Sequence, residues 1–383
     1  MVMNNEIVTE VAFAEKIAAN GGRVFRVGGC VRDQIMGIMP QDIDFCIVGM
    51  VKKNFKTLFP KAEEYGKSFP VFHLLIDGVQ CELAFARTER KVSSGYRGFK
   101  IASNPKITIE EDLYRRDTTV NSMAMDCLTG EIIDPYHGRQ DINDKILRAT
   151  SEHFSDDPMR ALRLASQAAR FDFVVEDRTL LLARAVAQEL IQEPAERMLI
   201  ELTKVLTTAQ RPSVFFRLLE VTNLLEITFK ELWELPKDDF DKAMIMLDGV
   251  AQITAKPKVR FALLGLYLDR PKMLLWNNRM TLPGDWLDSA LIFRKTKILL
   301  DSPSPENMAI AMKGLGRGAL SIEEFDSIAQ GAGLSLPGLS NLNAKLKELL
   351  LAYSVPKECK GKDIGQWLLQ KQIELISKII ECK

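Results

Sequence analysis

The spacing of hydrophobic residues changes along the chain and divides it into two kinds of structure. Before the glycine pair at residues 21–22, apolar residues recur at helical spacing, so the pattern predicts a helix within residues 1–21. Between about residues 23 and 133, short runs rich in β-branched and aromatic residues alternate with clusters of glycine, proline and polar residues. This alternation is typical of the strands of a small α/β domain.

After about residue 151 the strand pattern fades, and apolar residues keep a helical period. Prolines such as Pro236, Pro257 and Pro271 interrupt the helical stretches, and no convincing internal repeat is visible. The pattern therefore predicts an α+β protein, with an α/β head in residues 1–150 and an all-helical remainder.

Composition narrows the class of protein. The chain has 383 residues, of which 46% are hydrophobic, so it is too apolar for a disordered chain and long enough for about two or three domains. No apolar run reaches the roughly 18 residues that a membrane span needs, and no membrane association is expected. Six scattered cysteines favour reduced thiols over a disulfide scaffold, and the acidic first twenty residues do not resemble a secretory signal. We therefore expect a cytoplasmic protein.

The overall charge neither indicates nor excludes a nucleic-acid partner. The chain carries 51 basic and 51 acidic residues, and its formal net charge is zero. Any surface that binds RNA must therefore come from local segregation of charge.

A glycine pair followed by two aspartates is the most informative stretch. A predicted strand runs into Gly28 and Gly29, and a short helix then opens. Glycine lets the backbone approach an anion closely, and the start of a helix presents N–H groups to it. Arg32 lies one turn into that helix and is able to donate to the same phosphates.

Asp42 and Asp44 follow on the next predicted strand. Because they are two residues apart, both carboxylates are expected to project from one face. Two neighbouring carboxylates repel each other unless a cation lies between them, which makes them good magnesium ligands. Alone, a glycine pair is usually a turn and a D-x-D motif is usually solvated, but their combination at this spacing has no ordinary structural reason.

Together these motifs resemble the head of the class II nucleotidyltransferases. This branch of the polymerase-β superfamily contains the CCA-adding tRNA nucleotidyltransferases and the bacterial poly(A) polymerases. Further motifs similar to the family's follow in the family's order, so the resemblance covers about residues 22–205, and the helical remainder matches loosely. They are Glu111-Asp112-Leu113-x-Arg115-Arg116-Asp117-x-Thr119-Val120-Asn121, Ile132-Ile133-Asp134-Pro135-Tyr136-x-Gly138, Asp156-Asp157-Pro158-x-Arg160-x-Leu162-Arg163 and Glu196-Arg197-x-x-x-Glu201-Leu202.

The resemblance implies an organisation and an activity. A polymerase-β-like head in residues 1–150 would be followed by a helical neck that reads the base in residues 151–205, and by a tRNA-binding body and tail in residues 206–383. The protein would add C, C and A to the 3′ end of tRNA from CTP and ATP, releasing pyrophosphate. No protein partner is implied.

The same resemblance assigns roles to residues of the head. Asp42 and Asp44 would be catalytic and would bind two Mg²⁺ ions. Glu82 is a candidate third carboxylate, although a plain surface glutamate on a strand is almost as good an interpretation. The triphosphate would be bound by Gly29, Arg32 and Arg116.

Asp157 and Arg160, with Arg163, lie in the motif that resembles the family's base-reading motif. The spacing puts Asp157 and Arg160 one helical turn apart, so their side chains are expected to share a face. A carboxylate accepts from an exocyclic amino group, and a guanidinium donates to the adjacent ring nitrogen. Cytosine and adenine present this pair, whereas uracil and guanine present the reverse, so the protein would select C and A. An ordinary i,i+3 salt bridge is the structural alternative. Arg163 continues the face, and Ser166 stands where many relatives have another arginine.

Three further features bear on the function. The basic segment at residues 87–116 resembles the loop that CCA-adding members need to switch from C to A, which favours them over poly(A) polymerases and CC-only enzymes. Leu266 and Tyr267 stand where related enzymes carry the His-Asp pair of a phosphohydrolase domain, so that activity is not expected. The stretch 314–318 resembles a fragment of a dinucleotide-binding loop but follows no strand, so it predicts a plain loop.

Three alternatives to a CCA-adding enzyme remain. They are a poly(A) polymerase, a partial CC- or A-adding enzyme and a non-catalytic RNA-binding protein.

Overall fold

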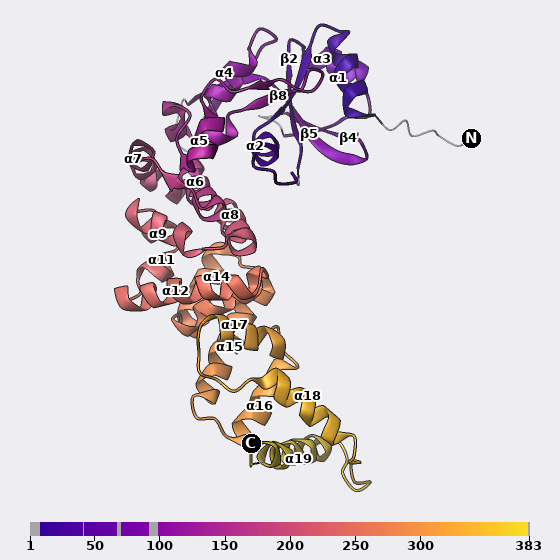
Figure 1. Cartoon of the computed structure of the whole chain (residues 1–383), viewed down its shortest axis with the longest axis vertical. Coiled ribbons are helices and arrows are strands. Elements are labelled where there is room, and N and C mark those ends of the chain that lie inside the picture. The colour runs from indigo at the N-terminus through magenta and orange to yellow at the C-terminus, as the bar shows by residue number, and fades with distance from the viewer. Residues whose placement is uncertain (1–7, 41, 67–69, 92–98, 382–383) are drawn as a thin grey trace, which may run out of the picture. The chain divides into compact units, whose positions relative to one another are not determined.

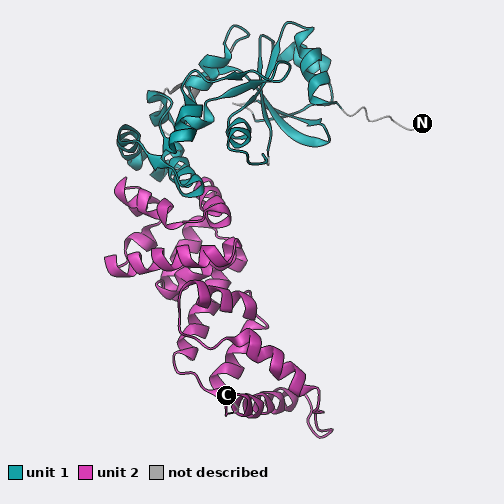
Figure 2. Ribbon diagram, in the orientation of Figure 1, with its two compact units in different colours: residues 1–193 teal, residues 194–383 magenta. Residues whose placement is uncertain are grey.

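The computed structural model describes residues 8–40, 42–66, 70–91 and 99–381. It divides into two compact units, residues 1–193 and residues 194–383, which Figure 2 shows in different colours. Within residues 87–103, the structure describes the backbone of a hairpin but not its tip at residues 92–98. The finer three-part division at residues 150 and 205 stays a prediction.

A seven-stranded mixed sheet forms the centre of the first unit (Figure 1). The strand order is β3-β4-β5-β2-β1-β8-β9, and β2 and β5 run parallel while the other neighbours run antiparallel. The short β-rich runs predicted between residues 23 and 133 include residues 24–27, 43–47, 71–76 and 82–85, and the structure confirms strands there as β1, β2, β4 and β5. The strands are β1 Arg23–Val27, β2 Asp44–Val48, β3 Glu63–Tyr65, β4 Val71–Ile76, β5 Val79–Phe85, β8 Ala124–Asp126 and β9 Ile132–Ile133.

Alternation along β2 separates the two faces of this sheet. Phe45 and Ile47 pack into a core with Phe13 of α1 (Glu10–Ala18) and Phe55 of α3 (Lys52–Leu58). Cys46 packs on the opposite face with Leu113 of α4 (Ile109–Tyr114). Asp44 shares the face of Cys46, because side chains two apart on a strand point the same way. The side of the sheet covered by α4 is therefore the side that carries the predicted site.

The remaining elements of the first unit connect and extend the sheet. The predicted N-terminal helix is confirmed as α1, and β6 and β7 form a separate hairpin. The elements are α1 Glu10–Ala18, α2 Gly29–Ile35, α3 Lys52–Leu58, β6 Arg87–Lys91, β7 Phe99–Ser103, α4 Ile109–Tyr114, η1 Thr119–Asn121, α5 Gly138–Asp144, β10 Ile146–Leu147, η2 Glu152–Asp156, α6 Met159–Phe171, β11 Val174–Val175, α7 Asp177–Ala185 and η3 Ala187–Gln192.

The second unit is helical in its described residues, as predicted. Buried aromatic rings of Phe215, Phe229, Phe261 and Trp276 contact one another in its core. In the part of the chain that the structure describes, no helix has both the length and the apolar character needed to cross a membrane. The helices are α8 Ala195–Thr208, α9 Ser213–Val221, α10 Leu225–Thr228, α11 Lys230–Trp233, α12 Lys237–Ile253, α13 Pro257–Ala262, η4 Leu263–Leu266, α14 Arg270–Met280, α15 Gly284–Leu300, α16 Pro305–Leu315, α17 Ile322–Gly331, α18 Leu339–Leu350 and α19 Lys362–Glu381.

Candidate active site

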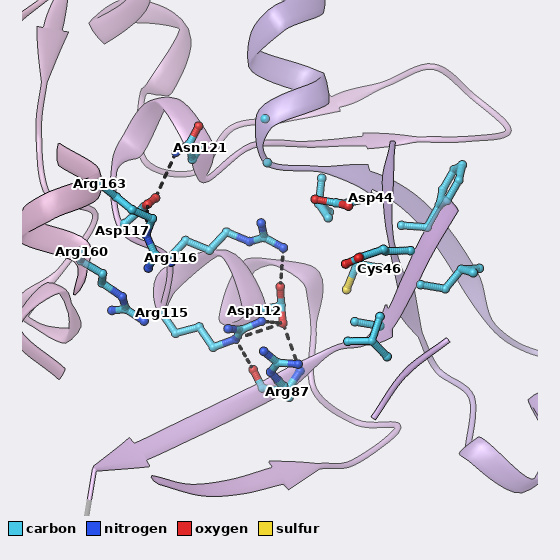
Figure 3. A pocket seen from close by; sticks show the side chains of 18 residues that line it. Asp44, Cys46, Arg87, Asp112, Arg115, Arg116, Asp117, Asn121, Arg160 and Arg163 are labelled. Carbon is cyan, nitrogen blue, oxygen red and sulfur yellow. Dashed lines mark hydrogen bonds and ion pairs between the residues drawn. The ribbon is translucent and has the colours of Figure 1, made fainter. Parts of the chain in front are cut away.

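A pocket of about 340 Å³ opens on the α4 side of the sheet in the first unit (Figure 3). It brings together residues that the sequence singled out from four separate motifs. They include Gly28, Gly29, Asp44, Glu82, Arg116, Arg160 and Arg163, together with Arg87, Asp112, Arg115, Asp117 and Asn121.

The glycine turn brings the backbone close to a guanidinium. Gly28 has φ of 74°, in the left-handed region that favours glycine, and Gly29 begins α2 directly after it. A Cβ atom at Gly28 would lie 2.8 Å from Nη1 of Arg116, too close for a real contact. A residue with a side chain would therefore displace Arg116 from the turn.

The carboxylates of the site come from two neighbouring strands. Asp44 of β2 and Glu82 of β5 are direct partners in the parallel register, and both line the pocket. Although Asp44 opens to solvent, partial desolvation by the surrounding protein, and then the charge of Glu82, raise its pKa to about 6. Nearby Asp42 adds to this rise and Arg116 opposes it.

One premise about these aspartates is wrong. Asp42 lies in a bend before β2, which begins at Asp44, so the two do not share a strand face. The physical reason is that β1 ends at Val27 and turns away at Gly28, so its pairing with β2 begins only at Phe45. Asp42 is still close enough to influence the charge of Asp44.

This set of oxygens has the chemistry that a divalent cation requires. Asp44 and Glu82 are neighbouring carboxylates. The pKa of Asp44 is raised first by desolvation and then by the charge of Glu82, and a bound cation would offset both effects. Within the described residues, no three carboxylate, histidine or cysteine groups already converge on one point. A cation bound by Asp44 and Glu82 would therefore require their side chains to turn toward a common point.

Asp112 organises the arginines of the pocket, a role that the sequence analysis did not assign. Its carboxylate is 1% exposed and accepts from Nη2 of Arg115 at 2.6 Å and from Nη2 of Arg116 at 3.1 Å. Burial alone would raise the pKa of Asp112, but the charges of Arg115 and Arg116 hold it below its ordinary value. The spacing of three and four residues along a helix was the available signal.

Arg116 keeps a donor for a ligand. Nη2 is bonded to Asp112, whereas the buried Nε has no hydrogen-bond partner among the described residues. Buried donors are usually satisfied, so an unused one at a pocket wall indicates a place for an acceptor such as a phosphate oxygen.

The hairpin β6–β7 is attached to this same cluster. The backbone N–H of Arg87 donates to Asp112 at 3.2 Å, and Nε of Arg115 donates to the backbone carbonyl of Arg87 at 3.1 Å. The root of the hairpin and the arginines of the pocket are therefore held by one carboxylate. The tip of the basic segment, including Tyr96, lies outside the described residues.

Asp117 ties the pocket to α6. It accepts from Nδ2 of Asn121 at 3.1 Å and from Nε2 of Gln167 at 3.3 Å, and it pairs with Nε of Arg163 at 3.3 Å. Burial alone would raise the pKa of Asp117, but Arg163 and the hydrogen bond from Asn121 hold it below its ordinary value. Arg163 is thereby oriented at the edge of the pocket.

Arg32 lies beside the pocket with its guanidinium engaged by the protein. Nη1 donates to Oδ1 of Asn121 at 2.6 Å, Nη2 donates to Asp33 at 2.6 Å, and the group lies 4.4 Å from the ring centroid of Phe171. In this arrangement Arg32 links α2 to η1 and α6. Its expected contact with a triphosphate stays a prediction.

Of the residues predicted to read the base, Asp157 does not lie on the helix that carries Arg160 and Arg163. Arg160 and Arg163 line the pocket from α6, but Asp157 precedes that helix and has extended backbone. The cause is Pro158, because a residue before proline is disfavoured in the helical region. Oδ1 of Asp157 accepts from the N–H of Met159 at 3.0 Å. The premise that Asp157 and Arg160 share a helical face is therefore wrong.

Ser166 is fully buried in α6, and its Oγ has no hydrogen-bond partner among the described residues. It does not line the pocket. The hydroxyl of Ser166 therefore makes no contact with the pocket.

Two family models match the chain. Residues 24–148 match the poly A polymerase head domain, and residues 172–235 match a model described as the probable RNA and SrmB-binding site of polymerase A. The first match contains the glycine turn and the carboxylates, and the second begins in the first unit and continues into the second.

Individual relatives agree with these matches over nearly the whole chain. A CCA-adding enzyme of Coxiella burnetii is 33% identical over 379 residues, covering 94% of this chain and 96% of the relative. A solved CCA-adding enzyme in complex with ATP has a TM-score of 0.70 at 22% identity, covering 96% of this chain and 89% of that one. The Thermotoga maritima CCA-adding enzyme complexed with tRNA-CCA has a TM-score of 0.68 at 20% identity, covering 96% and 90%.

The structural likeness confirms an α+β nucleotidyltransferase head with a helical remainder. The Coxiella relative matches this chain along almost its full length. On these grounds the chain belongs to the family of CCA-adding enzymes, which are nucleotidyltransferases.

Proposed function

We propose that this protein adds C, C and A to the 3′ end of tRNA from CTP and ATP, releasing pyrophosphate. The observation that carries the proposal is the pocket in which Asp44 and Glu82 face the arginines held by Asp112. Carboxylates on one side and guanidinium groups on the other suit a metal-bound triphosphate. A relative named for CCA addition supports this activity. Solved CCA-adding enzymes in complex with ATP and with tRNA support these two substrates.

Members of this family use divalent metal ions, and Mg²⁺ is the ion that we propose here. Asp42, Asp44 and Glu82 would hold it, because hard oxygen ligands suit this cation. When bound, it would lower the charge on the reacting phosphate and favour ionisation of the RNA 3′-hydroxyl.

The chain's own groups would position the nucleotide. The N–H groups at the start of α2 and the unused Nε of Arg116 would donate to phosphate oxygens. Asp112 keeps Arg115 and Arg116 in fixed orientations, so little reorganisation is needed when the triphosphate enters.

We assign selection of the base to Asp157, Arg160 and Arg163. Arg160 is 5% exposed, and its Nη1 donates to the backbone carbonyl of His153, so its orientation is constrained. Asp157 pairs with Nη2 of Arg163 at 3.5 Å. A carboxylate and a guanidinium held in this way would accept C and A, and would leave buried groups mispaired with U or G.

The hairpin β6–β7 favours full CCA addition over the partial activities, because the basic segment that resembles the switching loop is present and attached to the pocket. The five described cysteines are free thiols, which agrees with a reducing compartment. We therefore also propose that the reaction takes place in the cytoplasm.

The test uses tRNA that lacks its last three nucleotides, incubated with the protein and Mg²⁺. We expect CTP alone to add two nucleotides, and CTP with ATP to add three and then stop. Long A-tails from ATP alone would instead show a poly(A) polymerase, and arrest after CC would show a partial enzyme. No extension under any condition, with tRNA still bound, would contradict catalysis. As a control, Glu131→Gln removes an exposed carboxylate of the same unit and should extend tRNA as the wild type does.

A further inference from the structure

Helix α6 carries one buried amide among apolar neighbours. Gln167 is 5% exposed, whereas Leu164 and Ala168, which lie on either side of it along the same helix, are at most 1% exposed. Burial of an amide is costly unless its two ends are hydrogen-bonded. Gln167 does not line the pocket of the first unit, so any role that it has in the reaction must act through another residue.

Both ends of the Gln167 amide are engaged by the segment that precedes η1. Its Oε1 accepts from Oγ1 of Thr118 at 2.9 Å, and its Nε2 donates to Oδ2 of Asp117 at 3.3 Å. A flipped amide would place its oxygen against the carboxylate of Asp117, where two acceptors repel each other. The hydroxyl of Thr118, which is fully buried, therefore fixes the direction in which Gln167 donates.

The oxygen that receives Gln167 is also the oxygen that faces Arg163. Oδ2 of Asp117 lies 3.3 Å from Nε of Arg163, and Arg163 lies one helical turn before Gln167 on α6. The other oxygen of Asp117 accepts from the N–H of Thr118 at 2.8 Å and from Nδ2 of Asn121 at 3.1 Å (Figure 3). Each oxygen of Asp117 is therefore held by a neutral donor, and the position of Oδ2 beside Arg163 depends on Gln167.

Arg163 connects this anchor to the residues that we assign to the base. Its Nη2 lies 3.5 Å from Oδ2 of Asp157, and its side chain lines the pocket. The contacts form an unbroken series from Thr118 through Gln167, Asp117 and Arg163 to Asp157. A change at Gln167 would therefore reach the guanidinium and the carboxylate of the base site without removing a group that lines the pocket.

We propose that Gln167 is a positioning residue for nucleotide selection. It fixes Oδ2 of Asp117, and Asp117 in turn fixes the guanidinium of Arg163 beside Asp157. Groups that are already in place discriminate best, because they do not have to be ordered as the base enters. This inference rests on the proposed function, because that function assigns Arg163 and Asp157 to the base.

The experiment compares single-nucleotide incorporation of CTP and UTP into tRNA that lacks CCA. Gln167→Leu removes both hydrogen bonds at similar volume, and Thr118→Val removes only the bond that orients the amide. The preference for C over U should fall by about two- to tenfold in Gln167→Leu, the effect of one hydrogen bond, and by a smaller factor in Thr118→Val. Ser166→Ala is the matched control, because Ser166 is the fully buried neighbour whose Oγ has no partner among the described residues. Its ratio should stay at the wild-type value.

Inhibition by inorganic tripolyphosphate separates a positioning role from a loss of structure. This anion has the phosphates of a nucleotide but no base, so it should compete with CTP at the glycine turn and Arg116. In Gln167→Leu its inhibition constant should stay at the wild-type value while KM for CTP rises. If tripolyphosphate affinity instead falls in step with CTP affinity, Gln167 only stabilises the fold and the inference is overturned.

An unchanged ratio of C to U in folded Gln167→Leu would also overturn the inference. If this variant does not fold, the ratio in Thr118→Val decides in the same way, because it loses the bond that directs the amide toward Asp117.

The two proposals fail in distinguishable ways, because equilibrium binding of CTP and UTP is measured without extension of tRNA. If the wild type adds CCA and the variants keep its ratio of C to U, the proposed function stands and the inference fails. If the wild type extends no tRNA but binds CTP more tightly than UTP, and Gln167→Leu loses that preference, the role of Gln167 stands and the proposed function fails. A wild type that neither extends tRNA nor prefers CTP would overturn both.

Discussion

The two pockets of this protein treat their cations in opposite ways. In the head, Arg115 and Arg116 are held by Asp112, and Arg163 is paired with Asp117. The helical unit has a second pocket, of about 640 Å³, which we call the basic groove. Its lining cations, Arg270, Arg294, Lys295 and Arg317, have no carboxylate partner among the described residues. A pocket that places a reacting phosphate needs fixed donors, and buried carboxylates fix them. A surface that binds a long polyanion needs charge more than geometry. We therefore expect head variants to change turnover and selectivity, and groove variants to change affinity for tRNA.

The largest effect should come from Asp44→Asn. The substitution keeps the size of the side chain but removes a charge that we assign to metal binding. Metal-ion catalysis supplies several kcal/mol, so addition of CTP should fall by about a thousandfold or more. Single-turnover extension of tRNA measures this loss. The affinity for tRNA should stay at the wild-type value. A variant that loses affinity but keeps turnover would contradict the contrast between the two pockets.

Asp112→Asn should affect both stability and nucleotide binding. Removing one partner from a buried ion pair costs about 3 to 5 kcal/mol, so the free energy of unfolding of the first unit should fall by that order. Chemical denaturation measures this change, with Glu110→Gln, an exposed acid of the same helix, as control. KM for CTP should also rise, because Arg115 and Arg116 lose their fixed orientation. An unchanged KM in a folded variant would show that Asp112 stabilises the fold alone.

The same residue predicts a response to acid. Because the pKa of Asp112 is lowered in the folded state, its contribution to stability is complete above the unfolded pKa of about 3.9. The contribution is lost as the pH falls from there through the lower folded pKa. Denaturation of the wild type between pH 5 and pH 2 should therefore show a steeper loss than in Asp112→Asn. Parallel curves for the two proteins would contradict this assignment.

Selectivity should change by a smaller factor. Asp157→Ala removes the acceptor proposed for the exocyclic amino group, and Arg160→Ala removes the donor to the ring nitrogen. Each should reduce the preference for C over U by about one to two decades, the effect of one hydrogen bond to a charged group. Single-nucleotide incorporation of CTP and UTP measures the ratio, with Glu152→Ala as a nearby exposed control. An unchanged ratio in both variants would place base recognition elsewhere.

The smallest expected effect is a change in tRNA affinity caused by a substitution in the basic groove. Asp288 is the acid that lines the basic groove, and Asp288→Asn removes its repulsion of an incoming phosphate. An exposed charge contributes about 0.2 to 1 kcal/mol, so tRNA should bind up to about fivefold more tightly. The gain should disappear at high salt. Weaker binding by this variant would show that the groove does not receive an anion.

Regular patterns of residues allowed most of the fold to be predicted from the sequence. The strands at residues 24–27 and 71–76 and the helices after residue 159 follow from hydrophobic period and β-branched content. Two local details were not predictable from period alone. Asp42 lies outside β2 because β1 turns away at Gly28, and Asp157 lies outside α6 because Pro158 follows it.

The site was predictable where its residues are close in the sequence. The glycine turn and the carboxylate pair share one short segment, so their chemistry was visible in the pattern. The spacing of Asp112 to Arg115 and Arg116 was a signal for part of its role, but its bond to the backbone of Arg87, 25 residues away, was not visible in the pattern. The basic groove was not predictable either, since four cations from separate elements converge only when the helices pack.

The attachment of the β6–β7 hairpin has a consequence for how this protein is able to evolve. Asp112 and Arg115 bind the hairpin through the backbone N–H and carbonyl of residue 87. Every amino acid except proline offers the same two atoms. A substitution at residue 87 other than proline would therefore keep these two backbone bonds. Asp112 and Arg115 make the bonds with their side chains, so replacing either residue would remove its bond to the hairpin.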